Sequence, residues 1–222
     1  KLIDQKTITV KIKYRHPDWI QIHKDLIKFK KMGYPIYQPF IHPDFNWIST
    51  NYSEERFQVI KNNITIKSGD ALDIGANFGY FSHKLEDLGF SCYAVEFSSR
   101  HAYFIKKFRD IAGKNFRIIN KSIFDFTEKN YFDLVLALNI FHHFLKTKDS
   151  YENLIELLKR LEMKEMFFQA HDFKMNQMKG AYVNLDPQQF VDFILKYSCL
   201  NKATLIAKTV DGRNRPLYRL NA

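Results

Sequence analysis

From residue 70 onward, short apolar runs alternate with segments in which apolar residues recur at helical spacing. This alternation is typical of a parallel β-sheet whose strands are joined by helices. The predicted strands cover 70–74, 91–95, 116–120, 132–138, 165–170, 203–208 and 216–220. The predicted helices cover 79–88, 98–112, 149–162 and 187–198. The pattern predicts an α/β protein with a seven-stranded, mostly parallel sheet, helices on both faces and a final antiparallel pair of strands.

The first 66 residues have a less regular pattern, in which three prolines interrupt the middle. They predict an extended arm over 7–14, a helix over 20–32, a loop over 33–47 and a helix from Ser53 to about residue 62. Ser53 is a residue type that caps helices, and the acids that follow it suit the positive end of the helix dipole. We expect residues 1–66 to form an N-terminal helical cap on a core domain over 67–222.

An acid and two glycines follow the first core strand, at Asp73, Gly75 and Gly79, and a second acid, Glu96, ends the next strand. In an open α/β sheet, glycines at this turn let the backbone approach a nucleotide, and the second acid accepts hydrogen bonds from ribose hydroxyls. The dinucleotide fingerprint would need a glycine at Asn77, and Asp73 would repel a pyrophosphate. The spacing therefore favours a nucleoside with a cationic amino-acid end. The alternative is an ordinary strand–helix turn with an incidental acid.

This arrangement resembles motif I of the class I S-adenosylmethionine (SAM) methyltransferases, with Glu96 in the place of their ribose-binding acid. The resemblance implies a Rossmann-like fold, SAM as the cofactor and methyl transfer as the reaction. In that family the glycine-rich loop approaches the methionine part, Asp73 would orient the loop or meet the amino group, and Phe97 would pack on adenine. The implied cofactor contacts are Asp73, Gly75, Ala76, Asn77, Gly79, Glu96, Phe97, Ser122, Ile123 and Asn139.

The residues after the third predicted strand offer two choices for recognition of the adenine amino group. Family members often have an acid here, whereas this chain has Ser122 at that position and Asp125 three positions later. A backbone contact at Ile123 is the alternative.

The segment Asn139–His143 follows the fourth predicted strand and faces both SAM and the acceptor in this family. It lacks the N-P-P-[YF] or D-P-P-[YF] pattern of enzymes that methylate base amines, which argues against DNA amino-methylation. His142 and His143 are candidate general bases, because imidazole titrates near neutral pH. Adjacent side chains cannot both face the same way, so we expect one base and one structural histidine. Packing or helix capping is the alternative role for each.

The residues after the fifth predicted strand lie where an acceptor-site lid usually begins. His171 and Asp172 are candidate acceptor contacts. The segment 172–185 contains two methionines and a glycine, and it is interpreted either as a mobile lid or as a packed loop.

The composition of the chain is notable mainly for its excess of basic residues. The net charge is +10 and the sequence pI is about 9.4, which favours anionic partners such as nucleic acid, phosphorylated glycans or anionic lipid. The alternative is a lysine-rich, solvated surface, because no run of five basic residues occurs. Two cysteines without a C-x-x-C pair predict neither a disulfide framework nor a metal site. The longest apolar run is too short to span a bilayer, no secretory signal opens the chain, and a cytoplasmic location is expected.

Three short segments narrow the resemblance. Arg15–Trp19, Asn139–His143 and Arg213–Tyr218 look like pieces of the methyltransferase module in the bifunctional kinase–methyltransferases that terminate bacterial O-antigen polysaccharide. That resemblance implies SAM-dependent methylation of a phosphate on a terminal sugar. It also implies that Arg56, which matches an arginine of the module, pairs with the carboxylate of the cofactor.

Three functions remain open from the sequence. The first is O-methyl transfer to a saccharide or sugar-phosphate, so that the partner is an anionic or hydroxylated acceptor such as a phosphoglycan. The second is an RNA methyltransferase, for example one acting on tRNA, and it rests on the charge and the aromatic content. The third is a SAM-binding module without catalysis, which the replacement of a glycine by Asn77 favours.

Overall fold

The computed structural model describes residues 17–34, 36, 38–42, 45, 53–209 and 215–222. Several sequence predictions lie outside these residues. They are the extended arm over 7–14, Arg15 and His16, most of the proline-rich loop after residue 42, the side chain of Ser53 as a helix cap, and Arg213 with Asn214.

Strands and helices alternate in the order that the hydrophobic pattern predicts. The helices are α1 (Pro17–Lys31), α2 (Ser53–Asn63), α3 (Tyr80–Asp87), α4 (Ser99–Ile111), α5 (Lys148–Arg160) and α6 (Pro187–Tyr197). The strands are β1 (Gly69–Ile74), β2 (Phe90–Val95), β3 (Arg117–Ile119), β4 (Tyr131–Leu138), β5 (Glu162–Gln169), β6 (Lys202–Ala207) and β7 (Leu217–Asn221). Short 3-10 turns are η2 (Ile123–Asp125), η3 (Phe141–Leu145) and η4 (Asn176–Met178). Most boundaries agree with the predictions within two residues, but α1 and β5 each begin three residues earlier than predicted.

The seven strands form one sheet in the order β3-β2-β1-β4-β5-β7-β6. Strands β1 to β5 are parallel, and β7 runs antiparallel to both of its neighbours. The antiparallel pairing of the last two strands is confirmed. The pair lies at one edge of the sheet, and β7, although it comes last in the chain, lies between β5 and β6. The chain moves outward from β1 to β3 and then returns to β4, so the sheet has its switch point between β1 and β4, where ligands bind in such folds.

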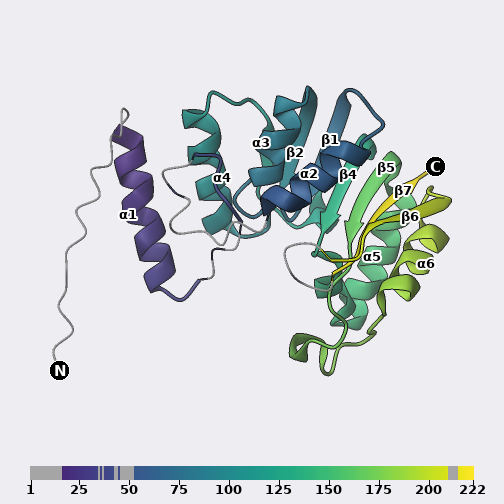
Figure 1. Cartoon of the computed structure of the whole chain (residues 1–222). Coiled ribbons are helices and arrows are strands. Elements are labelled where there is room, and N and C mark those ends of the chain that lie inside the picture. Colours follow the sequence, from purple (N-terminus) through teal and green to yellow (C-terminus); the bar gives the residue numbers. More distant parts are fainter. Residues whose placement is uncertain (1–16, 35, 37, 43–44, 46–52, 210–214) are drawn as a thin grey trace.

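Helices cover both faces of the sheet (Figure 1), as the sequence predicts. One face packs against α5 and α6, whose buried side chains include Leu157 and Phe190. The other face packs against α2 and α3 through side chains such as Ile60 and Phe81. Parallel strands buried on both faces need apolar residues throughout, and β4 meets this need with four consecutive fully buried positions from Leu134 to Ala137.

Helix α1 lies beside α4 at one end of the molecule (Figure 1). Its buried face carries Ile22, Leu26 and Phe29, which join Phe104 of α4 and Phe78 of the β1–α3 turn in a separate apolar cluster. The N-terminal segment therefore packs directly against the glycine-rich turn. The boundary between cap and core at residue 66 stays a prediction.

The N-cap of α6 is built from residues that lie close together in the sequence. The Asp186 carboxylate accepts a hydrogen bond from the Gln189 backbone N–H at 2.9 Å, and the Gln189 side chain accepts one from the Asp186 N–H at 3.0 Å. This reciprocal capping box, with Pro187 in the first turn, satisfies two donors that the helix leaves open.

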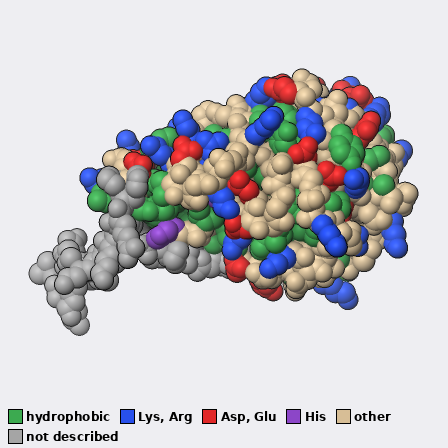
Figure 2. All heavy atoms as spheres, turned by 90° about the horizontal axis from the view of Figure 1, so that it is seen from above, with side chains coloured by type: hydrophobic (Ala, Val, Ile, Leu, Met, Phe, Trp, Pro, Cys, Tyr) green, Lys and Arg blue, Asp and Glu red, His purple; other side chains and the backbone are tan. Residues whose placement is uncertain are grey.

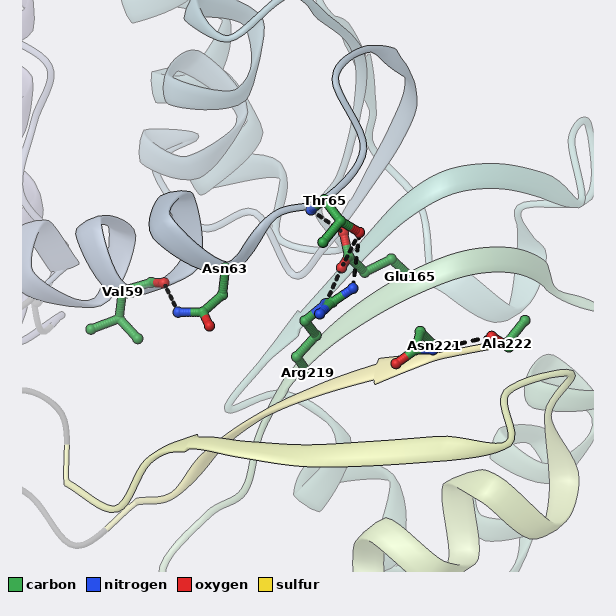
Figure 3. A network of polar contacts seen from close by, with 7 residues as sticks. All are labelled: Val59, Asn63, Thr65, Glu165, Arg219, Asn221 and Ala222. Carbon is green, nitrogen blue, oxygen red and sulfur yellow. Dashed lines mark hydrogen bonds and ion pairs between the residues drawn. The ribbon is translucent and has the colours of Figure 1, made fainter.

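A polar network around one buried carboxylate joins the far end of α2 to the C-terminal strands (Figure 3). The carboxylate of Glu165 on β5 is 1% exposed and forms an ion pair with Arg219 of β7. The hydroxyl of Thr65, in the connection from α2 to β1, donates to Glu165 at 3.2 Å, and the Arg219 Nη2 donates to that hydroxyl at 2.9 Å. The network ties Thr65 to residues that follow it by 100 and 154 positions in the sequence. Its hydrogen bonds and ion pair offset the desolvation of the Glu165 carboxylate.

Across the described part of the chain, we find no helix with the length and apolar character needed to cross a membrane.

Candidate functional site

The turn between β1 and α3 has the backbone shape that its glycines allow. Gly75 and Gly79 have φ values of +73° and +78°, and Asn77 between them has a φ of +56°. A side chain at Gly75 would strain the backbone and would place a Cβ 2.9 Å from Cδ1 of Ile140. Asparagine is one of the few other residues that tolerate this left-handed conformation, so Asn77 replaces the expected glycine without changing the turn.

Two sets of backbone hydrogen bonds hold the turn against β2. The N–H groups of Gly75 and Ala76 both donate to the Val95 carbonyl, at 2.9 and 3.1 Å. Beyond them, the Glu96 carboxylate accepts from the Asn77 N–H at 2.8 Å. Ala76 is therefore part of the scaffold that shapes the turn.

Glu96 has both carboxylate oxygens engaged. Its Oε2 accepts from Asn77, and its Oε1 accepts from the Ser98 N–H at 2.8 Å. Burial raises the pKa of this carboxyl, and the two backbone hydrogen bonds act in the opposite direction because they favour the charged form. Each oxygen keeps a second lone pair, so the carboxylate remains able to accept hydrogen bonds from a ligand.

Asp73 lies deeper and is 3% exposed. Its Oδ2 accepts a hydrogen bond from the Ser82 hydroxyl of α3 at 2.7 Å. Burial, together with the negative charge of Glu96, raises the pKa of this carboxyl to about 6, although the Ser82 hydrogen bonds and the Arg56 charge oppose the shift. The contact with Ser82 fits the predicted role of Asp73 in orienting the turn and the helix that follows.

A cavity of about 450 Å³ opens at the carboxyl ends of β1, β2 and β4. This volume is within the range of sites for small organic ligands. The cavity brings together seven predicted site residues, and these are Gly75, Asn77, Glu96, Phe97, Ser122, Ile123 and His143. They come from four separate segments of the chain, so the turns after neighbouring strands converge on this cavity.

The chemistry of the lining suits an adenosyl ligand. Phe97 exposes 78% of its surface, which is unusual for an aromatic residue and leaves a ring face for a base to stack on. Glu96 offers carboxylate oxygens to ribose hydroxyls, and the left-handed turn at Gly75 brings backbone rather than side chain to the ligand. These residues would hold SAM, which supplies a methyl group activated by a positively charged sulfur.

Several predicted residues lie outside the cavity wall. Arg56 donates from Nη1 to the Gln169 side chain at 2.8 Å, and its guanidinium lies 5.3 Å from the centre of the Phe81 ring. Asn139 has a φ of +56°, and its N–H donates to the Gln169 carbonyl at 3.1 Å. Asp125 is exposed on η2. Asp73, Ala76, Gly79 and His142 are likewise not part of the wall.

Seven residues that line the cavity were not among the individually predicted site residues, and these are Ile74, Val95, Ser98, His101, Lys121, Ile140 and Phe144. Ser98 and His101 follow Glu96 by two and five positions in the sequence. This closeness to the predicted ribose acid could have indicated that they line the same site. Ile140 and Phe144 flank the histidine pair, but nothing local distinguishes them from core residues.

The two adjacent histidines point to different places, as expected. His143 is exposed and lines the cavity. His142 is 2% exposed and lies between two other imidazoles, with ring centres 4.0 Å from His143 and 5.1 Å from the buried His171. Burial and the charges of neighbouring basic groups lower the pKa of His142 to about 2, and burial lowers those of His143 and His171. All three rings are therefore neutral near pH 7.

Hydrogen bonds assign the tautomers of the two buried rings. The Gln177 amide nitrogen lies 3.2 Å from His142 Nε2, so in this orientation of the amide His142 accepts there and carries its proton on Nδ1. Asn184 donates through its amide nitrogen to the Phe173 carbonyl, which leaves its oxygen to accept from His171 Nε2 at 3.3 Å. His142 therefore has its basic nitrogen occupied, whereas His143 presents a ring to the cavity.

The segment 172–185 is packed rather than loose. The N–H groups of Tyr182 and Val183 donate to carbonyls at the end of η3 and just after it, at 3.1 Å each. Met178 is 3% exposed and belongs to the core cluster. The packed-loop interpretation agrees with these contacts, and His171 lies behind His142 rather than beside the cavity.

The fold agrees with that of known proteins. Residues 72–160 match a family model described as a methyltransferase domain. The bifunctional kinase–methyltransferase WbdD superposes with a TM-score of 0.71 at 18% identity, over 88% of this chain and 46% of WbdD. The chain thus spans less than half the length of that protein. No protein of curated function matches the sequence.

Two smaller methyltransferases share the fold over most of their length. The N-methyltransferase NodS from Bradyrhizobium japonicum WM9 has a TM-score of 0.60 at 16% identity, over 78% of this chain and 97% of NodS. Magnesium protoporphyrin IX methyltransferase (ChlM) from Synechocystis PCC 6803, solved with bound SAM, has a TM-score of 0.54 at 10% identity, over 74% of each chain. Residues 72–160 therefore match the methyltransferase-domain family, and the chain has the fold of these SAM-dependent methyltransferases.

Proposed function

We propose that this enzyme transfers the methyl group to an oxygen of a saccharide or sugar-phosphate acceptor. The observation that carries the proposal is the basic, imidazole-bearing wall beside the cofactor cavity. His143 lines the cavity, and the positive charges of Lys146 and Arg215 act on the histidine cluster behind it. A wall of this kind favours a hydroxyl that must lose a proton, or an anionic phosphate.

The resemblance to the kinase–methyltransferases that terminate O-antigen chains supports the same acceptor class. It places a phosphorylated sugar end among the acceptors to be tested first. Arg215 belongs to one of the segments that carry this resemblance, and its Nη2 lies 3.5 Å from the Met175 sulfur at the start of the loop that covers the histidines. In the proposed arrangement, the acceptor approaches from the side on which this guanidinium lies.

In the proposed reaction, transfer forms an oxygen–carbon bond and breaks the sulfur–carbon bond, and the electron pair of that bond stays on sulfur. The chain's main task is alignment, which is worth roughly 7–11 kcal/mol when the reacting atoms are held about 3 Å apart. For a hydroxyl acceptor, the neutral ring of His143 takes the proton. For a phosphate acceptor no base is needed, and basic residues only position the anion. His142 serves the site by packing, because its Nε2 already accepts from Gln177.

The test is transfer of a labelled methyl group from SAM to phosphoglycans, unphosphorylated glycans and tRNA, by the intact protein and by His143→Gln. With a hydroxyl acceptor, His143→Gln should lower kcat by about 100-fold or more, as expected for loss of a general base, with little change in KM. With a phosphate acceptor the variant should keep most of its activity, and Arg215→Met should raise KM instead. Absence of transfer to any glycan, with transfer to tRNA, would overturn the proposal.

The pH dependence separates the same two cases. Because burial lowers the pKa of His143 below its usual 6.5, kcat/KM on a hydroxyl acceptor should rise with pH through a value below 6.5 and then level off. On a phosphate acceptor, or in His143→Gln, this rise should be absent.

RNA is the second candidate acceptor, and the net charge of +10 is the observation that favours it. On the face shown in Figure 2, however, lysine and arginine side chains are dispersed among acidic and polar ones and form no continuous stripe. If RNA is not the acceptor, binding of tRNA should be weak and independent of sequence, with a shallow dependence of log K on log salt. A steep salt slope together with methyl transfer to RNA would favour the second candidate.

A further inference from the structure

His101 is a polar side chain of the cofactor cavity to which the sequence motifs assign no role. It lies in the first turn of α4, five positions after Glu96, and lines the cavity beside Glu96 and Ser98. Its backbone N–H donates to the hydroxyl of Ser98, the N-cap of α4, at 3.4 Å. The position of the residue is therefore set by the same short segment that carries the ribose acid.

Two aromatic rings hold the imidazole of His101 in one orientation. The ring makes edge-to-face contacts with Phe78 at 5.0 Å and with Phe29 at 5.4 Å between ring centres. Both phenylalanines are at most 5% exposed, so the imidazole is confined by well-packed neighbours. One of them comes from the cofactor turn and the other from α1.

The two nitrogens of this ring differ in access. Nδ1 is buried and has no hydrogen-bond partner among the described residues, whereas Nε2 is not buried. Since the residue lines the cavity, Nε2 is the ring nitrogen that a ligand can reach. Burial and the neighbouring Arg100 lower the pKa of His101 to about 4, so the ring is neutral and has one N–H to donate.

A ribose in this cavity needs both acceptors and donors. Glu96 uses one lone pair of each oxygen on the N–H groups of Asn77 and Ser98, and it offers the other lone pairs to ribose hydroxyls. A hydroxyl that donates to a carboxylate still has oxygen lone pairs, and these need a donor once water is excluded. The Glu96 carboxylate has no proton to give, but a neutral imidazole beside it does.

We propose that the Nε2–H of His101 donates a hydrogen bond to a ribose hydroxyl of the adenosyl cofactor, so that Glu96 and His101 recognise the ribose together. His101 then acts as a specificity residue for the sugar of the cofactor. The inference rests on the SAM site alone and is independent of the acceptor, so failure of the proposed acceptor class would leave it standing.

The test is calorimetric binding of S-adenosylhomocysteine and of its 2′-deoxy and 3′-deoxy analogues to the full chain. His101→Phe keeps an aromatic ring against Phe78 and Phe29 but removes the N–H. We expect this variant to bind S-adenosylhomocysteine about 3- to 10-fold more weakly, as for loss of one hydrogen bond. In the intact protein, one of the two deoxy analogues should bind more weakly than S-adenosylhomocysteine because it lacks the hydroxyl that His101 contacts. In His101→Phe, this difference in affinity should be smaller by the same factor, because the variant no longer contacts that hydroxyl.

Matched variants separate a ribose contact from a packing effect. His101→Gln retains a donor and should keep the full penalty for the deoxy analogue. Tyr103→Phe, on the same helix and outside this cavity, should leave all affinities unchanged. If the larger phenyl ring disturbs the cluster, His101→Leu supplies the same comparison. Equal penalties for both deoxy analogues in the intact protein and in the apolar variants would overturn the inference.

Discussion

Asp73 shows at the scale of single residues how a sequence motif becomes a physical constraint. The acid belongs to the predicted cofactor set, yet its carboxylate lies beneath the turn and accepts from Ser82. In this position it links β1 to the first turn of α3, on either side of the glycines. A group with this role affects the stability of the turn as well as its shape.

The raised pKa of Asp73 makes the stability of the protein depend on pH. The folded state holds this proton up to about pH 6, whereas an unfolded chain releases it near pH 4. The folded state thus binds more protons between these values, and the free energy of unfolding should fall as pH rises from about 4 to 6, by about 3 kcal/mol in total.

Asp73→Asn should remove this fall, because the amide keeps an acceptor for Ser82 and cannot ionise. Urea unfolding at a series of pH values between 4 and 7 measures the slope. The control is Asp149→Asn, a change of the same kind at an exposed position in the first turn of α5, which should leave the slope as it is. A slope in Asp73→Asn as steep as that of the intact protein would contradict the assignment.

The histidines show why neighbouring residues of one type take different roles. Positions 142 and 143 are indistinguishable by composition, but η3 turns one ring into the core and the other toward the cavity. The distinction depends on the loop over 172–185, in which the Gln177 side chain contacts His142. Burial then sets the chemistry, since a ring enclosed by apolar and basic neighbours stays neutral at any physiological pH.

Helix α1 is the element with the clearest influence on the site from outside the sheet. Phe29 on this helix contacts both Phe78 of the cofactor turn and His101 of α4. In addition, the Gln38 side chain accepts from the Phe78 N–H at 3.2 Å. The N-terminal segment therefore supports the turn from the side opposite the sheet.

Removal of the Phe29 ring should destabilise α1 and weaken cofactor binding together. Phe29→Ala is expected to cost about 3–5 kcal/mol locally, as for other buried phenylalanines, and to raise the Kd for S-adenosylhomocysteine. Hydrogen exchange of α1 and of residues 75–79 measures the first effect, and calorimetry measures the second. Ile20→Ala, at an exposed position of the same helix, serves as the control. Faster exchange in α1 with unchanged exchange at the turn would show that the two are not coupled.

At the scale of the whole molecule, contacts between segments far apart in the sequence hold β5, β7 and β6 together in one part of the sheet. Strand β7 comes last in the chain and inserts between β5 and β6. Glu165 and Arg219 lie on adjacent strands of this part, and Thr65 connects them to the end of α2 (Figure 3).

Breaking this network should lower the stability of the entire domain. Glu165→Ala leaves Arg219 without its buried partner and is expected to reduce the free energy of unfolding by about 3 kcal/mol. For a chain of this length, the loss corresponds to a decrease in Tm of roughly 6–12 °C. Differential scanning calorimetry provides the measurement. Glu162→Ala, on the same strand but exposed, should change Tm by less than about 2 °C, and equal effects of the two variants would show that burial of Glu165 adds nothing.

Much of this protein was determined by local sequence. The alternation of apolar runs and amphipathic segments predicted the order and number of strands and helices, because side-chain periodicity is a property of contiguous residues. Turn chemistry is local as well, so the left-handed positions at Gly75 and Gly79, the strand-end acid Glu96 and the capping box at Asp186 were accessible from spacing alone.

Only the tertiary structure decided the remainder. Insertion of β7 between β5 and β6, packing of α1 against the cofactor turn, burial of His142 and the arrival of His101 beside Glu96 all depend on residues distant in the chain. Such contacts form because segments from distant parts of the chain compete to bury apolar surface and to satisfy polar groups. The periodicity of a single segment does not predict which segments will pack together. The sequence therefore determined which chemistry was available, and packing determined which side chains line the cavity.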